Sequence, residues 1–291
     1  MVKKRAEVYQ EIRRTLLPRE GAQSAGMIAR ELICFVTEMR PERLLADMDA
    51  PMDEKQYLTV CRMTQRILSG EPLAYVLGQW DFYGMTLEVD PRVLIPRDDT
   101  CAVTELAIQQ GIFLKDNPRI LDICTGSGCI GIAVASRVKD AKVTLADPSR
   151  DALAVAKRNV AAQKLTGRVS CVQADAMKEP GSFLGKFDMI VSNPPYVTEQ
   201  EMTELPASVK DYEPHMALYG GTDGLDFYRS ICRNYRKALK PGGYLCFEFG
   251  MGQGDDVCRI LTENGFTVLE RTKDYHEIER AVLARYTEEG I

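Results

Sequence analysis

The residues best suited to chemistry are the consecutive Asn193-Pro194-Pro195-Tyr196, which directly follow an apolar run at 187–192. Such a run is typical of a buried parallel strand, so the four residues lie at a strand's carboxyl end, where open α/β sheets bind ligands. Two consecutive prolines fix φ and remove two backbone donors, which leaves a stiff loop rich in acceptors. The Asn193 side-chain oxygen and the Pro194 carbonyl could accept both hydrogens of one planar amino group, with the Tyr196 ring stacking on the substrate. We therefore expect Asn193, Pro194 and Tyr196 to be catalytic, and 193–196 to bind a substrate that presents an amide or an exocyclic amine.

A glycine-rich loop, Gly126-Ser127-Gly128-Cys129-Ile130-Gly131, lies between a predicted strand and a predicted helix. This G-x-G-x-x-G pattern lets the backbone approach a nucleotide at the helix N-terminus. Asp147 ends the next predicted strand, where its carboxylate can accept hydrogen bonds from ribose hydroxyls. Together the two features predict an adenosine-containing cofactor, either a dinucleotide or S-adenosylmethionine, although the glycines could simply permit tight packing of the helix on the strand. The motif at 193–196 favours S-adenosylmethionine, because a hydride-transfer site has no need of it.

The cofactor site is expected to extend from this loop to nearby acids and to the substrate loop. It comprises Asp122, Cys124, Thr125, Gly126, Ser127, Gly128, Asp147, Asp175, Ala176 and Asn193. Asp175 could accept a hydrogen bond from the adenine amino group or could only stabilise a turn. Asp122 could meet the cofactor's ammonium group or orient the glycine loop from behind.

Composition places the chain among ordinary soluble proteins, with 291 residues, 45% hydrophobic and 27% charged, which is enough for two domains. No stretch approaches the roughly 18 apolar residues of a membrane span, and no signal-peptide region follows the basic start, so we expect a cytoplasmic protein. Nine cysteines without C-x-x-C pairs and only two histidines predict reduced thiols and no metal site. The net charge of −5 disfavours nucleic acid as a direct partner. We also expect the protein to be a monomer.

The first seventy or so residues show helical periodicity. Apolar residues recur at helical spacing over 28–36 behind Ser24, which we expect to be a helix cap. Asp53 and Gln56 resemble a capping box that opens a second helix, and this helix is expected to stop at Gly70. These features predict a small helical domain.

From about residue 100, predicted strands alternate with helical stretches, which is the pattern of a doubly wound α/β sheet. The expected strands are Arg119–Ile123, Lys142–Asp147, Val169–Gln173, Phe187–Ser192 and Tyr244–Phe249, with an antiparallel C-terminal pair at Phe266–Arg271 and Arg280–Tyr286. Short strands at Gln79–Tyr83 and Met85–Val89 should form a hairpin around Gly84. We thus expect a helical domain over 1–72, a linker with a β-hairpin over 73–98 and the α/β domain over 99–291.

Several motifs together resemble a known family. The run 122–128 followed by Asn-Pro-Pro-Tyr is similar to class I S-adenosylmethionine-dependent methyltransferases that modify planar nitrogens. More specific motifs, at 72–78, 94–97, 212–214, 220–226 and 273–275, resemble the HemK/PrmC family along nearly the whole chain. The resemblance implies a Rossmann-like fold, S-adenosyl-L-methionine as cofactor, and methylation of the side-chain amide of the glutamine in the Gly-Gly-Gln motif of peptide chain release factors. It also implies that the helical domain recognises this protein substrate.

Four positions depart from the family's usual pattern. Cys124 stands in place of a glycine, Asp98 in place of a proline, Cys101 in place of a glutamate and Ala176 in place of a bulkier apolar or aromatic residue. The loop tolerates Cys124 if its φ is negative, and Ala176 indicates a looser adenine pocket. Two other functions stay open: methylation of an exocyclic adenine nitrogen in RNA or DNA, and cofactor binding without catalysis. The acidic charge argues against the first and the intact motif at 193–196 against the second.

Arg97 and Glu213 belong to two of the family motifs. Arg97 could contact substrate or cofactor, or could pair with its acidic neighbours Asp98 and Asp99. Glu213 is expected to brace the loop at 193–196.

Overall fold

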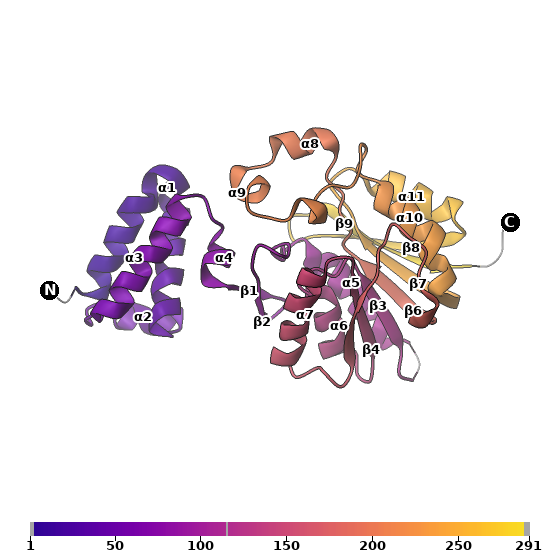
Figure 1. Cartoon of the computed structure of the whole chain (residues 1–291), viewed down its shortest axis with the longest axis horizontal. Helices are drawn as coiled ribbons and strands as arrows, with labels where there is room; N and C mark the ends of the chain where they lie inside the picture. The colour runs from indigo at the N-terminus through magenta and orange to yellow at the C-terminus, as the bar shows by residue number, and fades with distance from the viewer. Residues whose placement is uncertain (1–2, 115, 288–291) are drawn as a thin grey trace. The chain divides into compact units, whose positions relative to one another are not determined.

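The computed structural model describes residues 3–114 and 116–287, which divide into two compact units (Figure 1). The first unit contains the chain up to Gly78 together with the short segment Ala207–Tyr212. The second contains Gln79–Pro206 and the residues from Glu213 onward. Among the described residues, no helix combines the length and the apolar character needed to cross a membrane.

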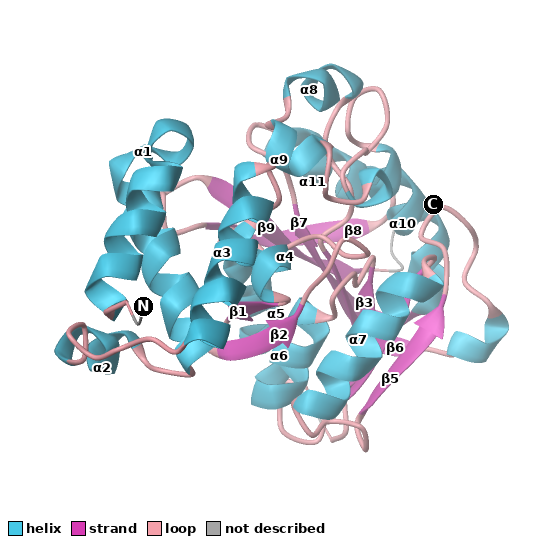
Figure 2. Cartoon of the chain, turned by 60° about the vertical axis from the view of Figure 1, so that its left-hand side comes forward, coloured by secondary structure: helices cyan, strands magenta, loops and turns pink. Residues whose placement is uncertain are grey.

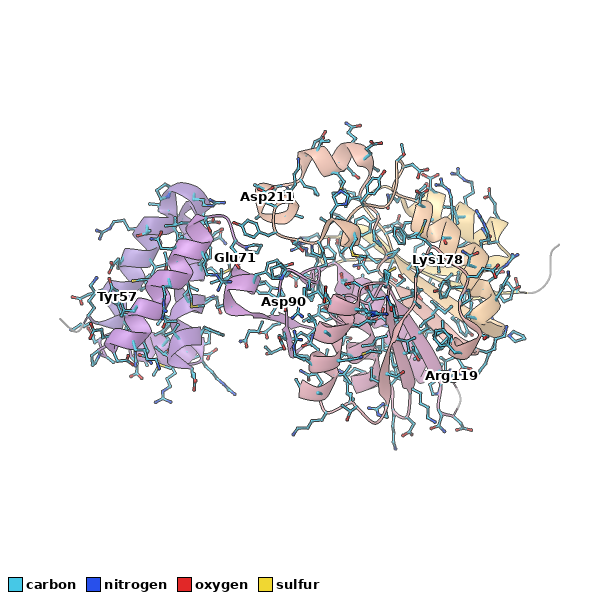
Figure 3. All side chains as sticks on the ribbon, in the orientation of Figure 1. Tyr57, Glu71, Asp90, Arg119, Lys178 and Asp211 are labelled. Atoms are coloured by element: carbon cyan, nitrogen blue, oxygen red, sulfur yellow. The ribbon has the colours of Figure 1, made fainter. Side chains whose placement is uncertain are left out.

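The first unit is built from helices. They are α1 (Arg5–Thr37), α2 (Pro41–Ala46), α3 (Glu54–Leu68) and α4 (Leu73–Leu77), with α9 (Ala207–Lys210) from later in the chain. Their shared core includes the buried side chains of Leu16, Leu32 and Val60. Tyr57 of α3, labelled in Figure 3, donates to Glu11 of α1 at 2.9 Å and accepts from Lys3 at 2.7 Å. Apolar burial and this polar contact together join α3 to α1.

The helix signals in this unit were only partly correct. Asp53 caps α3 as predicted, since its Oδ1 accepts from the Gln56 backbone N–H at 2.9 Å. The reciprocal half of the capping box is wrong, because the Gln56 side chain donates to the Val36 carbonyl instead. The predicted cap at Ser24 is also wrong. Ser24 lies inside α1, and the helix is interrupted at Gly21, where φ is 74° and ψ is 170°, a conformation that glycine adopts without a Cβ penalty.

The second unit is a doubly wound α/β domain preceded by a hairpin. Its strands are β1 (Gln79–Phe82), β2 (Met85–Glu88), β3 (Arg119–Ile123), β4 (Lys142–Asp147), β5 (Val169–Gln173), β6 (Phe187–Ser192), β7 (Leu239–Glu248), β8 (Phe266–Lys273) and β9 (Glu279–Tyr286). Its helices are α5 (Thr100–Ile112), α6 (Cys129–Arg137), α7 (Arg150–Ala162), α8 (Glu199–Glu204), α10 (Asp226–Tyr235) and α11 (Gly254–Glu263). The seven-stranded sheet has the order β5-β4-β3-β6-β7-β9-β8, in which β9 is antiparallel to β7 and to β8. The predicted fold class and its antiparallel C-terminal strands are confirmed.

The bounds of β3, β4, β5 and β6 agree with the prediction, whereas β7 begins at Leu239 rather than Tyr244 and ends at Glu248. The early part of β7 contains Pro241-Gly242-Gly243, a sequence typical of a turn. Gly242 has a φ of 72°, and the pairing of β7 with β6 shifts register between Phe187 and Met189. The turn-like residues therefore lie at an irregularity in the pairing of β6 with β7, and the strand continues past them.

Helices cover both faces of this sheet (Figure 2). On one face, α5, α6 and α7 bury side chains such as Val103, Ile132 and Ala156. On the other face, α10 and α11 bury Tyr228 and Leu261 against Phe247 of β7. The arrangement leaves the carboxyl ends of β3, β4 and β6 at one edge, where doubly wound sheets bind ligands.

Candidate active site

A cavity of about 540 Å³ opens at this edge of the second unit, within the size range of small-molecule sites. Its wall contains many of the residues predicted from the sequence, namely Cys124, Thr125, Gly126, Ser127, Asp147, Asp175, Asn193 and Pro195. The sequence did not indicate several other contributors, among them Arg92, Met177, His215 and Phe227. The cavity thus joins the glycine loop to the substrate loop.

The glycine loop between β3 and α6 leaves room for a ligand. A Cβ built on Gly126, where φ is 53°, meets no atom within 4 Å. A Cβ built on Gly131 would lie 2.2 Å from Leu145, so this glycine serves the close approach of α6 to β4. The Ser127 hydroxyl lines the cavity, is buried and has no hydrogen-bond partner. An open backbone beside an unpartnered hydroxyl fits a bound adenosine-containing cofactor.

Asp122 lies behind this loop rather than in the cavity wall. Its Oδ2 accepts from the Thr125 hydroxyl at 2.6 Å and from the Gly131 N–H at 2.9 Å. Burial raises the pKa of Asp122 to about 7, and these two hydrogen bonds oppose the effect. Of the two roles considered for Asp122, the contacts support the orientation of the loop.

Asp147, at the end of β4, combines a structural and a ligand-facing position. Its two oxygens accept from the backbone N–H groups of Gly126, at 3.0 Å, and Ser149, at 2.9 Å. Burial raises its pKa. Because each carboxylate oxygen can accept a second hydrogen bond, Asp147 can still receive ribose hydroxyls from the cavity.

Asp175 also lines the cavity, but its carboxylate is engaged locally. It accepts from the Met177 N–H at 2.9 Å and pairs with Lys178, labelled in Figure 3, at 3.2 Å. Ala176 is buried in the core beneath, and its carbonyl accepts from Ser230. Ala176 is absent from the described cavity wall, so its predicted contact with the cofactor is not supported, whereas Met177 lines the wall.

Cys124 adopts a backbone conformation that was not expected. Its φ is +61°, in the left-handed region, so the condition of a negative φ is not met. The loop keeps the geometry that suits a glycine, and the Cys124 Cβ carries a strain of about 1–2 kcal/mol. Burial raises the pKa of the Cys124 thiol well above its usual value, so the thiol is neutral.

The loop after β6 is divided between two hollows. Asn193 and Pro195 line the main cavity, whereas Tyr196 lines a neighbouring cavity of about 340 Å³ together with Gln253 and Arg280. The Asn193 Nδ2 donates to the Thr100 hydroxyl of α5 at 3.2 Å. This contact engages Nδ2 and leaves Oδ1 as the acceptor of the amide.

A second loop, Gly220–Gly224, holds the substrate loop in place. A Cβ on Gly220 would lie 2.6 Å from the Pro195 carbonyl oxygen, and a Cβ on Gly224 would lie 2.3 Å from the Tyr196 carbonyl oxygen. Gln253 of the loop before α11 donates to the same Tyr196 oxygen at 3.0 Å. Backbone contact of this kind, possible only with glycines, fixes the position of 193–196.

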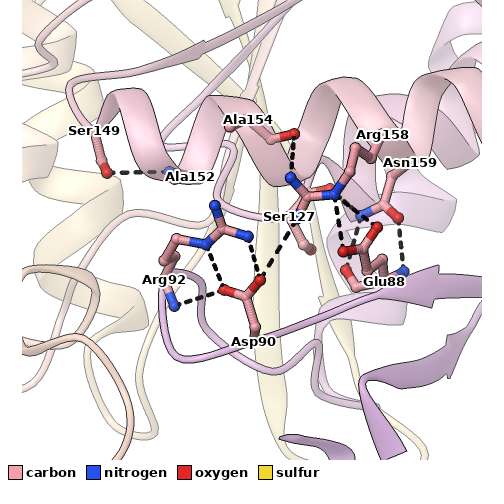
Figure 4. Close-up of polar contacts among 9 residues, drawn as sticks. All are labelled: Glu88, Asp90, Arg92, Ser127, Ser149, Ala152, Ala154, Arg158 and Asn159. Atoms are coloured by element: carbon pink, nitrogen blue, oxygen red, sulfur yellow. Dashed lines mark hydrogen bonds and ion pairs between the residues drawn. The ribbon is translucent and has the colours of Figure 1, made fainter.

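A polar network joins the hairpin to the glycine loop (Figure 4). Asn159 of α7 is buried, and its Nδ2 donates to the carbonyls of Ser127 and Glu88. Arg158 pairs with the Glu88 carboxylate at 2.8 Å, and Asp90 holds Arg92 in the cavity wall. Sequence reasoning missed Arg158 and Asn159 because their partners are distant in the chain.

Glu213 does not brace the loop at 193–196 as expected. Its buried carboxylate accepts from the Ile95 N–H at 3.1 Å and pairs with Arg97. Arg97 therefore pairs with neither acidic neighbour, and Asp99 instead pairs with Arg280 at 3.0 Å. The contacts of Glu213 thus hold the motif at 94–97 beside Pro214, and residues of both segments line the cavity.

Glu248 is the most unusual residue that the sequence analysis missed. It ends β7 within an apolar run and is only 1% exposed. Because Ser192 pairs with Phe247, the next residues, Asn193 and Glu248, are neighbours at the ends of parallel strands. A charged residue inside a predicted buried strand was the signal that could have revealed it.

Comparison with known proteins agrees with the geometry. Residues 7–78 match the PrmC N-terminal domain and residues 105–208 the methyltransferase small domain. The chain is 41% identical to a release factor glutamine methyltransferase of Clostridium acetobutylicum over 256 residues, which cover 87% of this chain and 88% of that protein. A second such enzyme, from Chlorobaculum tepidum, is 38% identical with the same coverage. A methyltransferase structure from Pyrococcus furiosus shares the fold at 19% identity, with a TM-score of 0.51 and coverage of 78% of this chain and 98% of that one.

Proposed function

The chain belongs to the PrmC/HemK family of release factor glutamine methyltransferases, and we propose that it methylates the side-chain amide nitrogen of the glutamine in the Gly-Gly-Gln motif of peptide chain release factors. The observation that carries this proposal is the placement of Asn193 in a cavity that also contains the glycine loop. A planar nitrogen held by Asn193 would then lie beside the group bound at that loop.

The residues present fit S-adenosyl-L-methionine, the methyl donor of this family. We assign Gly126, Ser127, Asp147 and Asp175 to its binding, with Cys124 and Thr125 in the same wall. Gly128 is absent from the described wall, and a Cβ there would lie 3.0 Å from Ile132, so this glycine serves packing instead. When bound, this group supplies an electrophilic methyl carbon attached to a positively charged sulfur.

The chain's own task is to activate and position a weak nucleophile. A primary amide nitrogen delocalises its lone pair into the carbonyl. Asn193 Oδ1 and the Pro194 carbonyl would accept hydrogen bonds from the two N–H groups and hold the nitrogen in line with the methyl carbon, while Pro195 lines the same cavity. Such positioning contributes up to roughly 7–11 kcal/mol in well-aligned model reactions. Methyl transfer would release one of the two amide protons, which would pass to water.

We further propose that the helical unit contacts the release factor, and that the enzyme acts as a monomer in the cytoplasm, where translation occurs. The nine cysteines, all unpaired, are consistent with a reducing compartment. A complex of one enzyme with one release factor in light scattering would support the monomer, and a dimeric mass would contradict it.

The proposal is tested by offering the enzyme and tritiated S-adenosyl-L-methionine to purified release factor, total RNA and DNA in parallel. Label should enter only the release factor, and mass spectrometry should locate one methyl group on the glutamine of Gly-Gly-Gln. Label in nucleic acid alone would establish the adenine alternative instead. Cofactor binding without label in any of the three would indicate a binding protein.

A further inference from the structure

Glu248 lies behind the substrate loop at a place where a charge is costly. The residue is 1% exposed, and neither carboxylate oxygen has a hydrogen-bond partner of good geometry. The nearby cation Arg280 is already paired with Asp99 at 3.0 Å and with Asp274 at 3.1 Å. An acid buried without compensation is destabilising, so its presence calls for a functional explanation.

The neighbours of Glu248 indicate what that function is. The Thr100 hydroxyl and the Asn193 amide lie close enough to favour its charged form. Thr100 itself is buried and accepts from Asn193 Nδ2 at 3.2 Å. Thr100 therefore contacts the amide assigned to bind the substrate, and both residues lie beside the buried carboxylate.

From this arrangement we propose that Glu248 is a positioning residue for methyl transfer, which sets the orientation of the Asn193 amide through the Thr100 hydroxyl. An ionised carboxylate only accepts hydrogen bonds, so it draws the Thr100 proton toward itself. The Thr100 lone pairs then receive Asn193 Nδ2, and Asn193 Oδ1 faces the substrate. The inference rests on the proposed function, in which that oxygen accepts from the glutamine amide.

The protonated acid would have the opposite effect. It would donate to Thr100, whose own proton could then turn to Asn193 Oδ1 and favour the flipped amide. Burial raises the pKa of Glu248 to about 7, with Asp99 adding to the shift and Thr100, Arg280 and Asn193 opposing it. The other titratable groups that interact with Glu248 are Cys101, Cys129, Tyr196 and Tyr228, whose pKa values are all raised by burial, so they are neutral near pH 7. The orientation of the Asn193 amide should therefore depend on the protonation state of Glu248.

The first experiment compares Glu248→Gln with wild type, and with Glu270→Gln as a matched control on the exposed surface of β8. Wild-type kcat should rise with pH through about 7. Glu248→Gln should lower kcat at least tenfold and abolish this rise, with an unchanged Kd for S-adenosyl-L-methionine and no loss of Tm at pH 8. Thr100→Val should lose activity similarly, and Thr100→Ser should restore it. Wild-type kcat and pH profile in Glu248→Gln would overturn the proposal.

A second measurement does not depend on the substrate. The side-chain amide resonances of Asn193, identified by their loss in Asn193→Ala, should titrate near pH 7 in wild type and not in Glu248→Gln. An Asn193 amide that is insensitive to pH would overturn the proposal even if release factor is methylated. Absence of methylation with a titrating Asn193 would contradict the proposed function alone.

Discussion

Replacement of Gly220 by alanine tests whether the position of the substrate loop controls the rate. A Cβ at 220 would lie 2.6 Å from the Pro195 carbonyl oxygen and 2.7 Å from the Tyr196 Cα, both of them backbone atoms. Restoring ordinary contact of 3.4 Å requires the Pro195 oxygen to move by about 0.8 Å. Because φ at Gly220 is not positive, alanine adds no backbone strain of its own. The substitution therefore acts mainly by displacing the loop.

A misplacement of about 1 Å can cost roughly 100-fold in rate, so we expect Gly220→Ala to lower kcat by about 10- to 100-fold. The Kd for S-adenosyl-L-methionine, measured by calorimetry, should change little because Gly220 is absent from the described cavity wall. Gly167→Ala is the matched control, since a Cβ there meets no atom within 4 Å. Wild-type kcat in a folded Gly220→Ala enzyme would refute the role assigned to loop position.

Four further substitutions test other parts of the site. Asn193→Ala should reduce methyl transfer more than about 100-fold in a radiolabel assay while the cofactor still binds. The substrate amide would lose an acceptor for one N–H group, and its nitrogen would no longer be aligned with the methyl carbon. Normal turnover would exclude the role assigned to Asn193. Cys124→Gly should stabilise the protein by up to about 1 kcal/mol in urea unfolding, because relief of left-handed strain exceeds the added entropy of the unfolded chain; destabilisation would show that thiol packing dominates. Gly131→Ala should lower unfolding free energy by about 1–3 kcal/mol through its clash with Leu145, and an unchanged midpoint would argue against tight helix packing. The pKa of Glu248 is about 7 in the folded protein and roughly 4.3 in the unfolded chain. The free energy of unfolding therefore falls as the pH rises between these two values. Glu248→Gln should therefore be more stable than wild type at pH 8, by on the order of 3 kcal/mol, and about equal at pH 4; a destabilised variant at pH 8 would contradict the shift.

The sheet was largely predictable because its signals are local. The strands β3 to β6 are short segments rich in apolar residues and bounded by turn residues, and each was placed correctly. The motif at 193–196 and the glycine loop could be assigned to one edge because parallel strands share the direction of their carboxyl ends. Local pattern and sheet topology were sufficient for these features.

The predictions from sequence were wrong where contacts between distant residues, or the conformation of the backbone, determine the structure. Glu213 contacts Ile95, more than one hundred residues away in the chain, and no local pattern shows this pairing. Gly21, rather than Ser24, interrupts α1, and Cys124 takes a positive φ because the surrounding loop overrides the preference of the residue. Glu248 was overlooked because it was treated as one residue of an apolar strand, although a buried acid is itself a signal of function.

The most direct test of the account is a crystal structure of the enzyme with S-adenosylhomocysteine and a release factor, in which the glutamine nitrogen of Gly-Gly-Gln is located. We predict hydrogen bonds of about 2.7–3.2 Å from this nitrogen to both Asn193 Oδ1 and the Pro194 carbonyl. A glutamine nitrogen bound by other groups, with Asn193 Oδ1 turned toward Thr100, would contradict the mechanism.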